Sequence, residues 1–284
     1  MSQSYTIGVD RKGDHFYTAQ VARDTGRPEV RSLVRFNCRQ IHENNDLDGA
    51  NVVLSVPDHQ VLAKRLRLDD IDAPDFRDRC TFELAQAMFE PEDAFRFDLL
   101  AIADSHYQLG LIYRREQLDN MLSEYSPGAE PTQVGYLVRA AALGRGYLSF
   151  CRQVPGELIA LADFTDNLAS ICLIRHRQVV ELAFLTLEEG DLSSDADIKR
   201  TTIEFKTVVN FKLSSCADRG ISLPLAALVL NGDRIDSRVR NVFAEYFPVG
   251  VSAPEIHRGF FHEQVDVNEI PLGSYLVALG LTVN

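Results

Sequence analysis

Two aspartates of this 284-residue chain lie where a carboxylate could handle a phosphate group or a metal ion. Asp10 follows the strand-like residues 5–9, Asp163 follows residues 158–162, and after each aspartate a short polar turn leads into a second apolar run. A hairpin of this kind holds a carboxylate at a strand end, while backbone N–H groups of its turn can face a phosphate or a metal-bound water. An ordinary hairpin whose aspartate caps the turn would give the same pattern. The spacing alone leaves both a phosphate site and a structural turn open.

The repeated hairpin predicts a chain of two related halves, residues 1–153 and residues 154–284. Apolar alternation and helical periodicity give the other elements. Besides the hairpins, we expect strands at residues 29–36, 51–55, 61–68, 95–103, 107–113, 178–186 and 225–230, and helices at residues 76–88, 118–125, 134–142, 195–219, 239–246 and 272–281. Ser194 and Asp197 form a capping-box pattern before the long helix, and Asp236 or Ser237 is expected to cap the next one. This mixture predicts an α/β fold.

Composition narrows the functional class. The net charge of −12 argues against binding to a nucleic-acid backbone, because that affinity rests on Lys and Arg neutralising phosphates. The five cysteines form no Cys-x-x-Cys pair, which is typical of reduced core residues in a cytoplasmic protein. We find no signal peptide and no apolar run near the roughly 18 residues that a membrane span requires. The seven histidines form no metal-binding pattern. The sequence therefore predicts a soluble cytoplasmic protein without a nucleic-acid partner, a membrane span or a metal site.

Several stretches, taken in order, resemble the type IV pilus assembly protein PilM family, a bacterial branch of the actin-like ATPases. The most specific is a helix, a proline and an acidic-aromatic strand over residues 80–91 (CTFELAQAMFEP) and 95–100 (FRFDLL). The others are residues 7–10 (IGVD), 52–57 (VVLSVP), 160–163 (ALAD), 229–232 (VLNG) and 277–281 (VALGL). The likeness covers most of the chain.

The resemblance implies an actin-like, ribonuclease-H-like α/β fold of duplicated βββαβα halves, with a small α/β subdomain inserted at about residues 55–125. Only ten residues, 188–197, lie where the family has a second-half subdomain that forms a wall of the nucleotide cleft, so we expect that subdomain to be missing. The resemblance places a nucleotide site at Asp10, Lys12, Gly13, Asp163, Thr165, Asp166, Asn231 and Gly232.

The phosphate loops depart from the family pattern. They lack glycines that let the backbone approach a phosphate, and they add negative charge at Asp14, Asp166 and Asp233. Two like charges ~4 Å apart repel by roughly 4 kcal/mol at an effective dielectric constant near 20, although a bound Mg²⁺ could offset one of them. We therefore expect a degenerate nucleotide site without a resident cofactor and without catalytic residues, while ATP with Mg²⁺ stays the alternative ligand.

The resemblance also implies a function. Relatives act at the inner face of the cytoplasmic membrane and bind the N-terminal cytoplasmic segment of an inner-membrane assembly protein, in a groove between the first subdomain and the inserted one. The predicted function is a scaffold of a type IV pilus or type II secretion-like assembly that does not hydrolyse ATP, with self-association left open. One alternative is an active Mg-ATPase or small-molecule kinase that uses Asp10 and Asp163. Another is a ribonuclease-H-like nuclease with Asp10 in a two-metal site.

Overall fold

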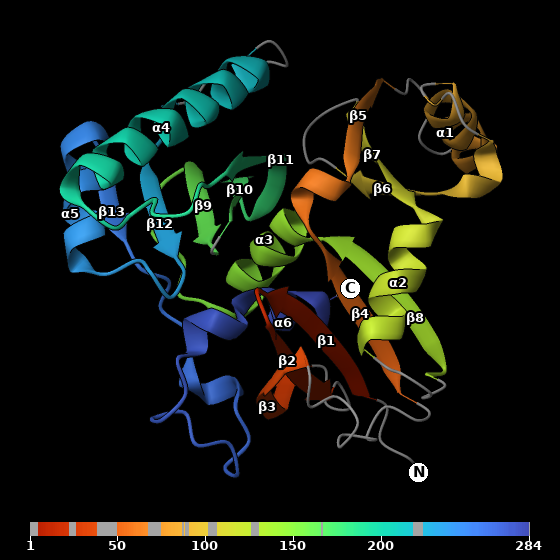
Figure 1. The fold of residues 1–284 in the computed structure, drawn as a ribbon, viewed down its shortest axis with the longest axis horizontal. Coiled ribbons are helices and arrows are strands. Elements are labelled where there is room, and N and C mark those ends of the chain that lie inside the picture. The colour runs from red at the N-terminus through yellow and green to blue at the C-terminus, as the bar shows by residue number, and fades with distance from the viewer. Residues whose placement is uncertain are drawn as a thin grey trace.

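The strands form three sheets in the computed structural model, which describes residues 5–22, 27–38, 50–67, 75–86, 88, 91–101, 107–125, 131–165, 167–217 and 224–283 (Figure 1). Within these residues, two sheets have five strands each and the third has three. The two larger sheets lie on either side of a central pair of helices, and the small sheet stands apart beside the first (Figure 1).

The two five-stranded sheets repeat one topology. Their strand orders are β3-β2-β1-β4-β8 and β11-β10-β9-β12-β13. In both, the first three strands of the half are antiparallel and the next two are parallel to the first. The first sheet consists of β1 (Tyr5–Lys12), β2 (His15–Ala22), β3 (Glu29–Asn37), β4 (Asn51–Val56) and β8 (Gln133–Val138). The second consists of β9 (Leu158–Phe164), β10 (Leu168–Arg175), β11 (Gln178–Thr186), β12 (Ala227–Asn231) and β13 (Gly250–Ser252). The predicted duplication is confirmed.

The inserted subdomain is also present, between β4 and β8. Its sheet has the order β5-β7-β6, from β5 (Leu62–Arg67), β6 (Phe95–Ala101) and β7 (Tyr107–Arg114), and α1 (Phe76–Ala85) packs on it. Leu66, Cys80 and Leu84 belong to its own apolar core. Helix α2 (Arg115–Tyr125) then leads back to the first sheet.

In the second half, β11 leads to the long helix α4 (Asp195–Ala217) through a turn at residues 187–194, all of them described. The subdomain that forms a wall of the nucleotide cleft in the family is therefore missing, as expected. The predicted capping box is confirmed, because Ser194 Oγ and Asp197 hydrogen-bond to each other in both directions. Asp236 caps the next helix, α5 (Ser237–Tyr246), by accepting from the backbone N–H of Val239.

The central helices α3 (Arg139–Phe150) and α6 (Leu276–Leu281) join the two halves. They pack closely, with α3 against β9, β10 and β11 and α6 against β1, β2 and β4. A Cβ on Gly280 would come within 1.8 Å of the carbonyl oxygen of Ala142, and one on Gly146 within 2.2 Å of that of Leu276. The two helices therefore touch backbone to backbone, which only glycine permits at these positions.

One predicted element is wrong. The helix expected at residues 134–142 is a strand, β8, up to Val138, and α3 begins only at Arg139. Residues 133–138 pair in parallel with the whole of β4, so a long-range sheet contact decides their conformation. This error matters for the site, because Arg139 lies at the junction between the strand and the helix.

No helix among the described residues is long and apolar enough to span a bilayer.

Candidate functional site

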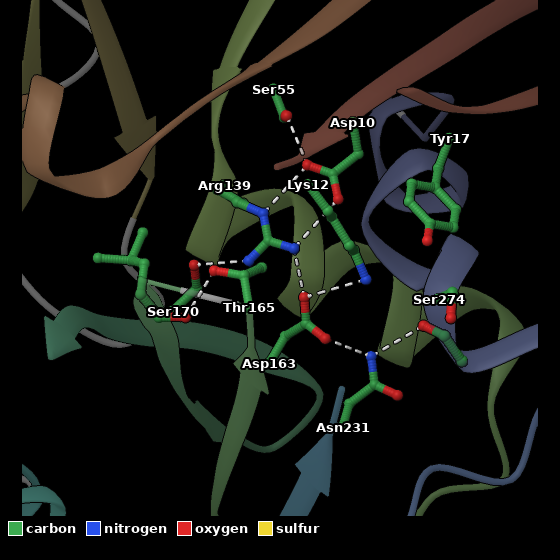
Figure 2. Close-up of polar contacts among 12 residues, drawn as sticks. Asp10, Lys12, Tyr17, Ser55, Arg139, Asp163, Thr165, Ser170, Asn231 and Ser274 are labelled. Carbon is green, nitrogen blue, oxygen red and sulfur yellow. Dashed lines mark hydrogen bonds and ion pairs between the residues drawn. The ribbon is translucent and has the colours of Figure 1, made fainter. Parts of the chain in front are cut away.

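The charged centre of the molecule lies between the two hairpins, where Asp10 of β1 and Asp163 of β9 face the same arginine (Figure 2). Arg139 donates from Nε to Asp10 Oδ1 at 3.0 Å and from Nη2 to Asp10 Oδ2 at 3.1 Å. The same Nη2 also donates to Asp163 Oδ2. Both carboxylates are fully buried, and the side chain of Arg139 is 2% exposed. The guanidinium of Arg139 thus forms ion pairs with strand-end aspartates of both halves.

Each carboxylate is also held by the neighbouring parallel strand of its own sheet. In the first sheet, Ser55 of β4 donates to Asp10 Oδ1 at 2.6 Å. In the second sheet, Asn231 of β12 lies opposite Asp163 and donates to its Oδ1, also at 2.6 Å. Because β4 and β12 have the same place in the duplicated sheets, Ser55 and Asn231 are equivalent residues. Each donates a hydrogen bond to the aspartate of its own half. The duplication extends to the hydrogen bonds of the site.

A second cation completes the group, since the Nζ of Lys12 lies 3.5 Å from Asp163 Oδ2. Burial alone would raise the pKa of Asp163, but Lys12 and Arg139 outweigh it and hold that pKa below its ordinary value. Burial also disfavours the charge on Arg139, and the two aspartates overcome this and raise the pKa of the guanidinium. Two carboxylates and two cations therefore form a neutral buried group.

In this arrangement each carboxylate oxygen of Asp10 and Asp163 already accepts at least one hydrogen bond. Asp10 accepts from Ser55 and Arg139, while Asp163 accepts from Asn231 and Arg139 and pairs with Lys12. In the described part of the chain, no group of three or more His, Cys, Asp or Glu side chains is placed to hold a metal ion. In this geometry both hairpin aspartates belong to a buried ion-pair network.

A third carboxylate, Asp58, extends the network from the turn Asp58–Gln60 that follows β4. Its Oδ1 accepts from the backbone N–H of Ala140 at 2.9 Å, and its Oδ2 accepts from the hydroxyl of Ser170. Ser170 in turn accepts from Arg139 Nη1 at 3.0 Å. Burial raises the pKa of Asp58 to about 6, although these hydrogen bonds and Arg139 act in the opposite direction.

Asp58→Asn is expected to remove a pH dependence of stability. The pKa of Asp58 is about 6 in the folded protein against an ordinary 3.8. The folded state thus holds this proton more tightly, and its contribution is present below about pH 4 and lost as the pH rises to about 6. The difference corresponds to about 3 kcal/mol. In urea unfolding, wild type should lose up to that amount relative to Asp58→Asn between about pH 4 and pH 7. A difference between the two proteins that stays constant over this range would contradict the prediction.

The structure brings together only part of the predicted nucleotide site. Asp10, Lys12, Asp163 and Asn231 meet in the network, whereas Asp166 lies outside the described residues. The other three residues shape turns.

Gly13 lies at the tip of the first hairpin with φ at 55°. Both the N–H and the hydroxyl of Thr165 donate to the carbonyl of Leu168 at 2.8 Å, which closes the second turn on itself. Gly232 has φ at 128°, and a Cβ there would come within 2.4 Å of the carbonyl oxygen of Phe164. These three residues shape turns, and the Thr165 N–H already donates to the carbonyl of Leu168.

Sequence reasoning missed Arg139, Ser55, Asp58 and Ser170. Arg139 had a visible signal, because it is the only charged residue between Pro131 and Gly144. A lone charge inside an apolar stretch that becomes buried needs a partner of opposite sign. The two aspartates at strand ends were the available partners.

Two cavities lie near this network and share no lining residue. The larger has a volume of about 690 Å³ and reaches Asp58 and Val138. The smaller has about 190 Å³, lies by the hairpin turns and is lined by Lys12 and Thr165 among others. The smaller cavity occupies the place where the predicted nucleotide loops meet.

Comparisons with known proteins identify the fold. No protein-family model matches the chain, and no curated protein sequence matches it. Among solved structures, the PilM–PilN type IV pilus biogenesis complex aligns with a TM-score of 0.72 and 13% identity, over 98% of this chain and 97% of that chain.

Two further structures align less closely. A Bacteroides thetaiotaomicron protein with actin-like ATPase fold has a TM-score of 0.53 and 9% identity, over 89% of this chain and 91% of that one. The ethanolamine utilization protein EutJ from Carboxydothermus hydrogenoformans has a TM-score of 0.52 and 10% identity, over 99% and 91%. The chain has the actin-like fold, in a form similar to that of PilM.

Proposed function

We propose that the chain is a cytoplasmic scaffold of a type IV pilus or type II secretion-like assembly and does not hydrolyse ATP. In this role it binds the N-terminal cytoplasmic segment of an inner-membrane assembly protein at the inner face of the cytoplasmic membrane. The observation that carries the proposal is the burial of Arg139 between Asp10 and Asp163 in a fold similar to that of PilM. The arginine takes up both carboxylates that an actin-like ATPase would need.

The energetics favour a scaffold over an ATPase. Phosphoryl transfer needs a Mg²⁺ ion that bridges phosphate oxygens and is held by the protein. To free Asp10 and Asp163 for that role, the protein would have to break a buried ion pair, which costs about 3–5 kcal/mol. The remaining cavity of about 190 Å³ is also smaller than the roughly 300 Å³ at the low end of small-molecule sites.

The larger cavity supplies a place for a partner segment, and we call it the docking cavity. It lies where the first half, the inserted subdomain and the second half meet, since Val138, Phe95 and Leu182 all line it. Most of its wall is apolar, formed by Val61, Leu62, Phe95, Leu111, Ile112, Val138, Leu182, Phe184 and Val208. Leu62 and Phe184 are 49% and 40% exposed, which offers apolar surface to a peptide side chain.

An ion-pair bridge joins the walls of the docking cavity. Arg65 of β5 donates to Glu181 Oε2 of β11 at 2.6 Å, and Lys212 of α4 lies 3.6 Å from Glu181 Oε1. Glu181 is 2% exposed, so removal of its cationic partners would leave a buried carboxylate without compensation. The inserted subdomain is thereby held against the second half, and the cavity is formed before any partner arrives. A preformed site lowers the ordering cost of binding.

Calorimetric titration tests the proposal. The probe is a synthetic peptide of the N-terminal cytoplasmic segment of an inner-membrane pilus or secretion assembly protein encoded in the same genome. We expect saturable binding without nucleotide, and the same affinity when Mg-ATP is added. Binding that requires Mg-ATP, or Mg²⁺-dependent phosphate release that is lost in Asp10→Ala and Asp163→Ala, would favour the ATPase alternative instead.

A further inference from the structure

The edges of two sheets border the docking cavity. β11 is the outermost strand of the second sheet, and β5 is an outermost strand of the inserted sheet. Residues 182–184 of β11 and residues 61–63 around the start of β5 line the cavity. Figure 1 shows β11 at the border of its sheet that lies nearest the inserted subdomain. Among the described residues, each of these strands pairs with one neighbour, so its other edge carries backbone groups outside the ladder.

The register with β10 shows which backbone groups of β11 point to this free edge. The N–H of Leu187 donates to the carbonyl of Asn167 at 2.9 Å, at the end of the β10–β11 ladder. Hydrogen-bonded residues alternate along an antiparallel ladder, so Leu185 and Ala183 also bond to β10. Phe184, which lies between them, therefore turns its N–H and C=O away from β10.

A segment that covers the free edge of β11 has to supply hydrogen bonds to it. Leu182 has the same orientation as Phe184, and its N–H donates to Glu181 Oε1 at 3.2 Å. Phe184 is 40% exposed at the wall of the docking cavity. Covering its N–H and C=O without a partner would be costly. An extended strand offers partners from alternate residues, whereas a helix uses its backbone groups internally.

A strand paired with β11 would direct its side chains alternately to two faces of the sheet. On one face, Phe184 belongs to the apolar wall of the docking cavity, together with Val138 of the first half. On the other face, Glu181 pairs with Lys212 of α4, and Val208 of the same helix lines the cavity. Apolar side chains at alternate positions of the added strand would thus lie against apolar wall.

The charges of the docking cavity favour an acidic side chain between these apolar ones. Its described lining residues include Arg114 and Lys212, and Asp58 is the one carboxylate among them. Asp58 is buried, and both of its oxygens already accept hydrogen bonds. The wall that a bound segment would meet is therefore cationic, although the whole chain has a net charge of −12.

We propose that the partner segment binds as an added β-strand on the free edge of β11. The segment has apolar residues at alternate positions and an acidic residue between them. This inference rests on the proposed function and adds the mode of binding. The edge belongs to the second half of the chain, and so lies outside the groove between the first subdomain and the inserted one that the resemblance implies.

Amide hydrogen exchange tests the strand pairing. It is measured by NMR on the full chain, with and without a saturating amount of the synthetic peptide used for calorimetry. We expect exchange of the Phe184 N–H to slow at least about 10-fold in the complex. The N–H groups of Ala183 and Leu185, which bond to β10, are internal controls and should change much less.

The possible results separate this inference from the proposed function. Peptide binding without slower exchange at Phe184 overturns the strand pairing and leaves the scaffold function standing. Equal slowing at Phe184, Ala183 and Leu185 overturns the pairing as well, because it reports a general stabilisation of the sheet. Absence of peptide binding overturns both.

A pair of variants gives an independent test. Phe184→Pro removes the outward N–H at an edge position, where sheets tolerate proline. Phe184→Ala removes the same ring and keeps the N–H, so it is the matched control. We expect the dissociation constant of the peptide to be about 5- to 10-fold weaker in Phe184→Pro than in Phe184→Ala. Equal affinities in the two folded variants overturn the pairing. If Phe184→Pro does not fold, the exchange measurement on wild type decides.

Discussion

Arg139→Met is expected to lower the free energy of unfolding by about 3–5 kcal/mol, because it leaves two buried carboxylates with a single lysine as counter-charge. The difference in free energy of unfolding between wild type and Arg139→Met should become smaller at acidic pH. In wild type the pKa of Asp163 is held below its ordinary value of 3.8, so its contribution to stability is present above that pH and disappears as the pH falls. In the variant, a protonated Asp163 no longer needs the guanidinium. Urea unfolding at about pH 7 and about pH 3.5 measures both effects.

Two comparisons make this result specific. Arg152→Met removes an exposed arginine whose carboxylate partner, Glu255, is 3.7 Å away, and it should cost less than about 1 kcal/mol. Asp10→Asn combined with Asp163→Asn in the Arg139→Met background should recover part of the loss, since amides need no counter-charge. A loss in Arg139→Met no larger than in Arg152→Met would contradict the network described above.

Phe184→Asp is expected to weaken binding of the partner peptide by about 10- to 100-fold. Burial of a phenylalanine side chain contributes about 1.5–3 kcal/mol, and about 1.4 kcal/mol corresponds to tenfold in affinity. Phe184 lines the docking cavity and is already 40% exposed, so the change should disturb folding little. Calorimetric titration of the variant with the peptide gives the affinity, and its unfolding curve confirms that it is folded.

Phe211→Asp is the matched control for this change. Phe211 is 70% exposed on α4 and does not line the docking cavity. The same substitution there should leave peptide affinity unchanged. Equal losses of peptide affinity in Phe184→Asp and Phe211→Asp would mean that the peptide binds elsewhere, or that the added negative charge alone weakens binding.

Local sequence signals predicted the fold well. The strand–aspartate–turn pattern at Asp10 and Asp163 identified the duplication, and the Ser194–Asp197 pattern placed the start of α4 correctly. These features depend on residues that are close in sequence, where hydrogen bonds and periodicity can be read directly.

The chemistry of the site depends on contacts that local patterns do not contain. Arg139 meets Asp10 across 129 positions and Asp163 across 24. Its place at the β8–α3 junction follows from the pairing of β8 with β4, which the periodicity of residues 134–142 did not indicate. Sequence reasoning counted the acidic residues near the loops and expected repulsion. It did not anticipate that buried cations from other elements would neutralise Asp10 and Asp163.

We infer that Asp10 and Asp163 hold Arg139 in place of a metal-bound nucleotide. Thermal unfolding with millimolar ATP, in the presence of either Mg²⁺ or EDTA, tests this inference. A ligand at 100 times its dissociation constant adds about 2.7 kcal/mol of stability, which shifts the melting temperature by several degrees in a protein of this size. We predict no Mg²⁺-dependent shift. A shift that requires Mg²⁺ and is lost in Asp163→Asn would contradict the claim and make the chain a nucleotide-binding ATPase.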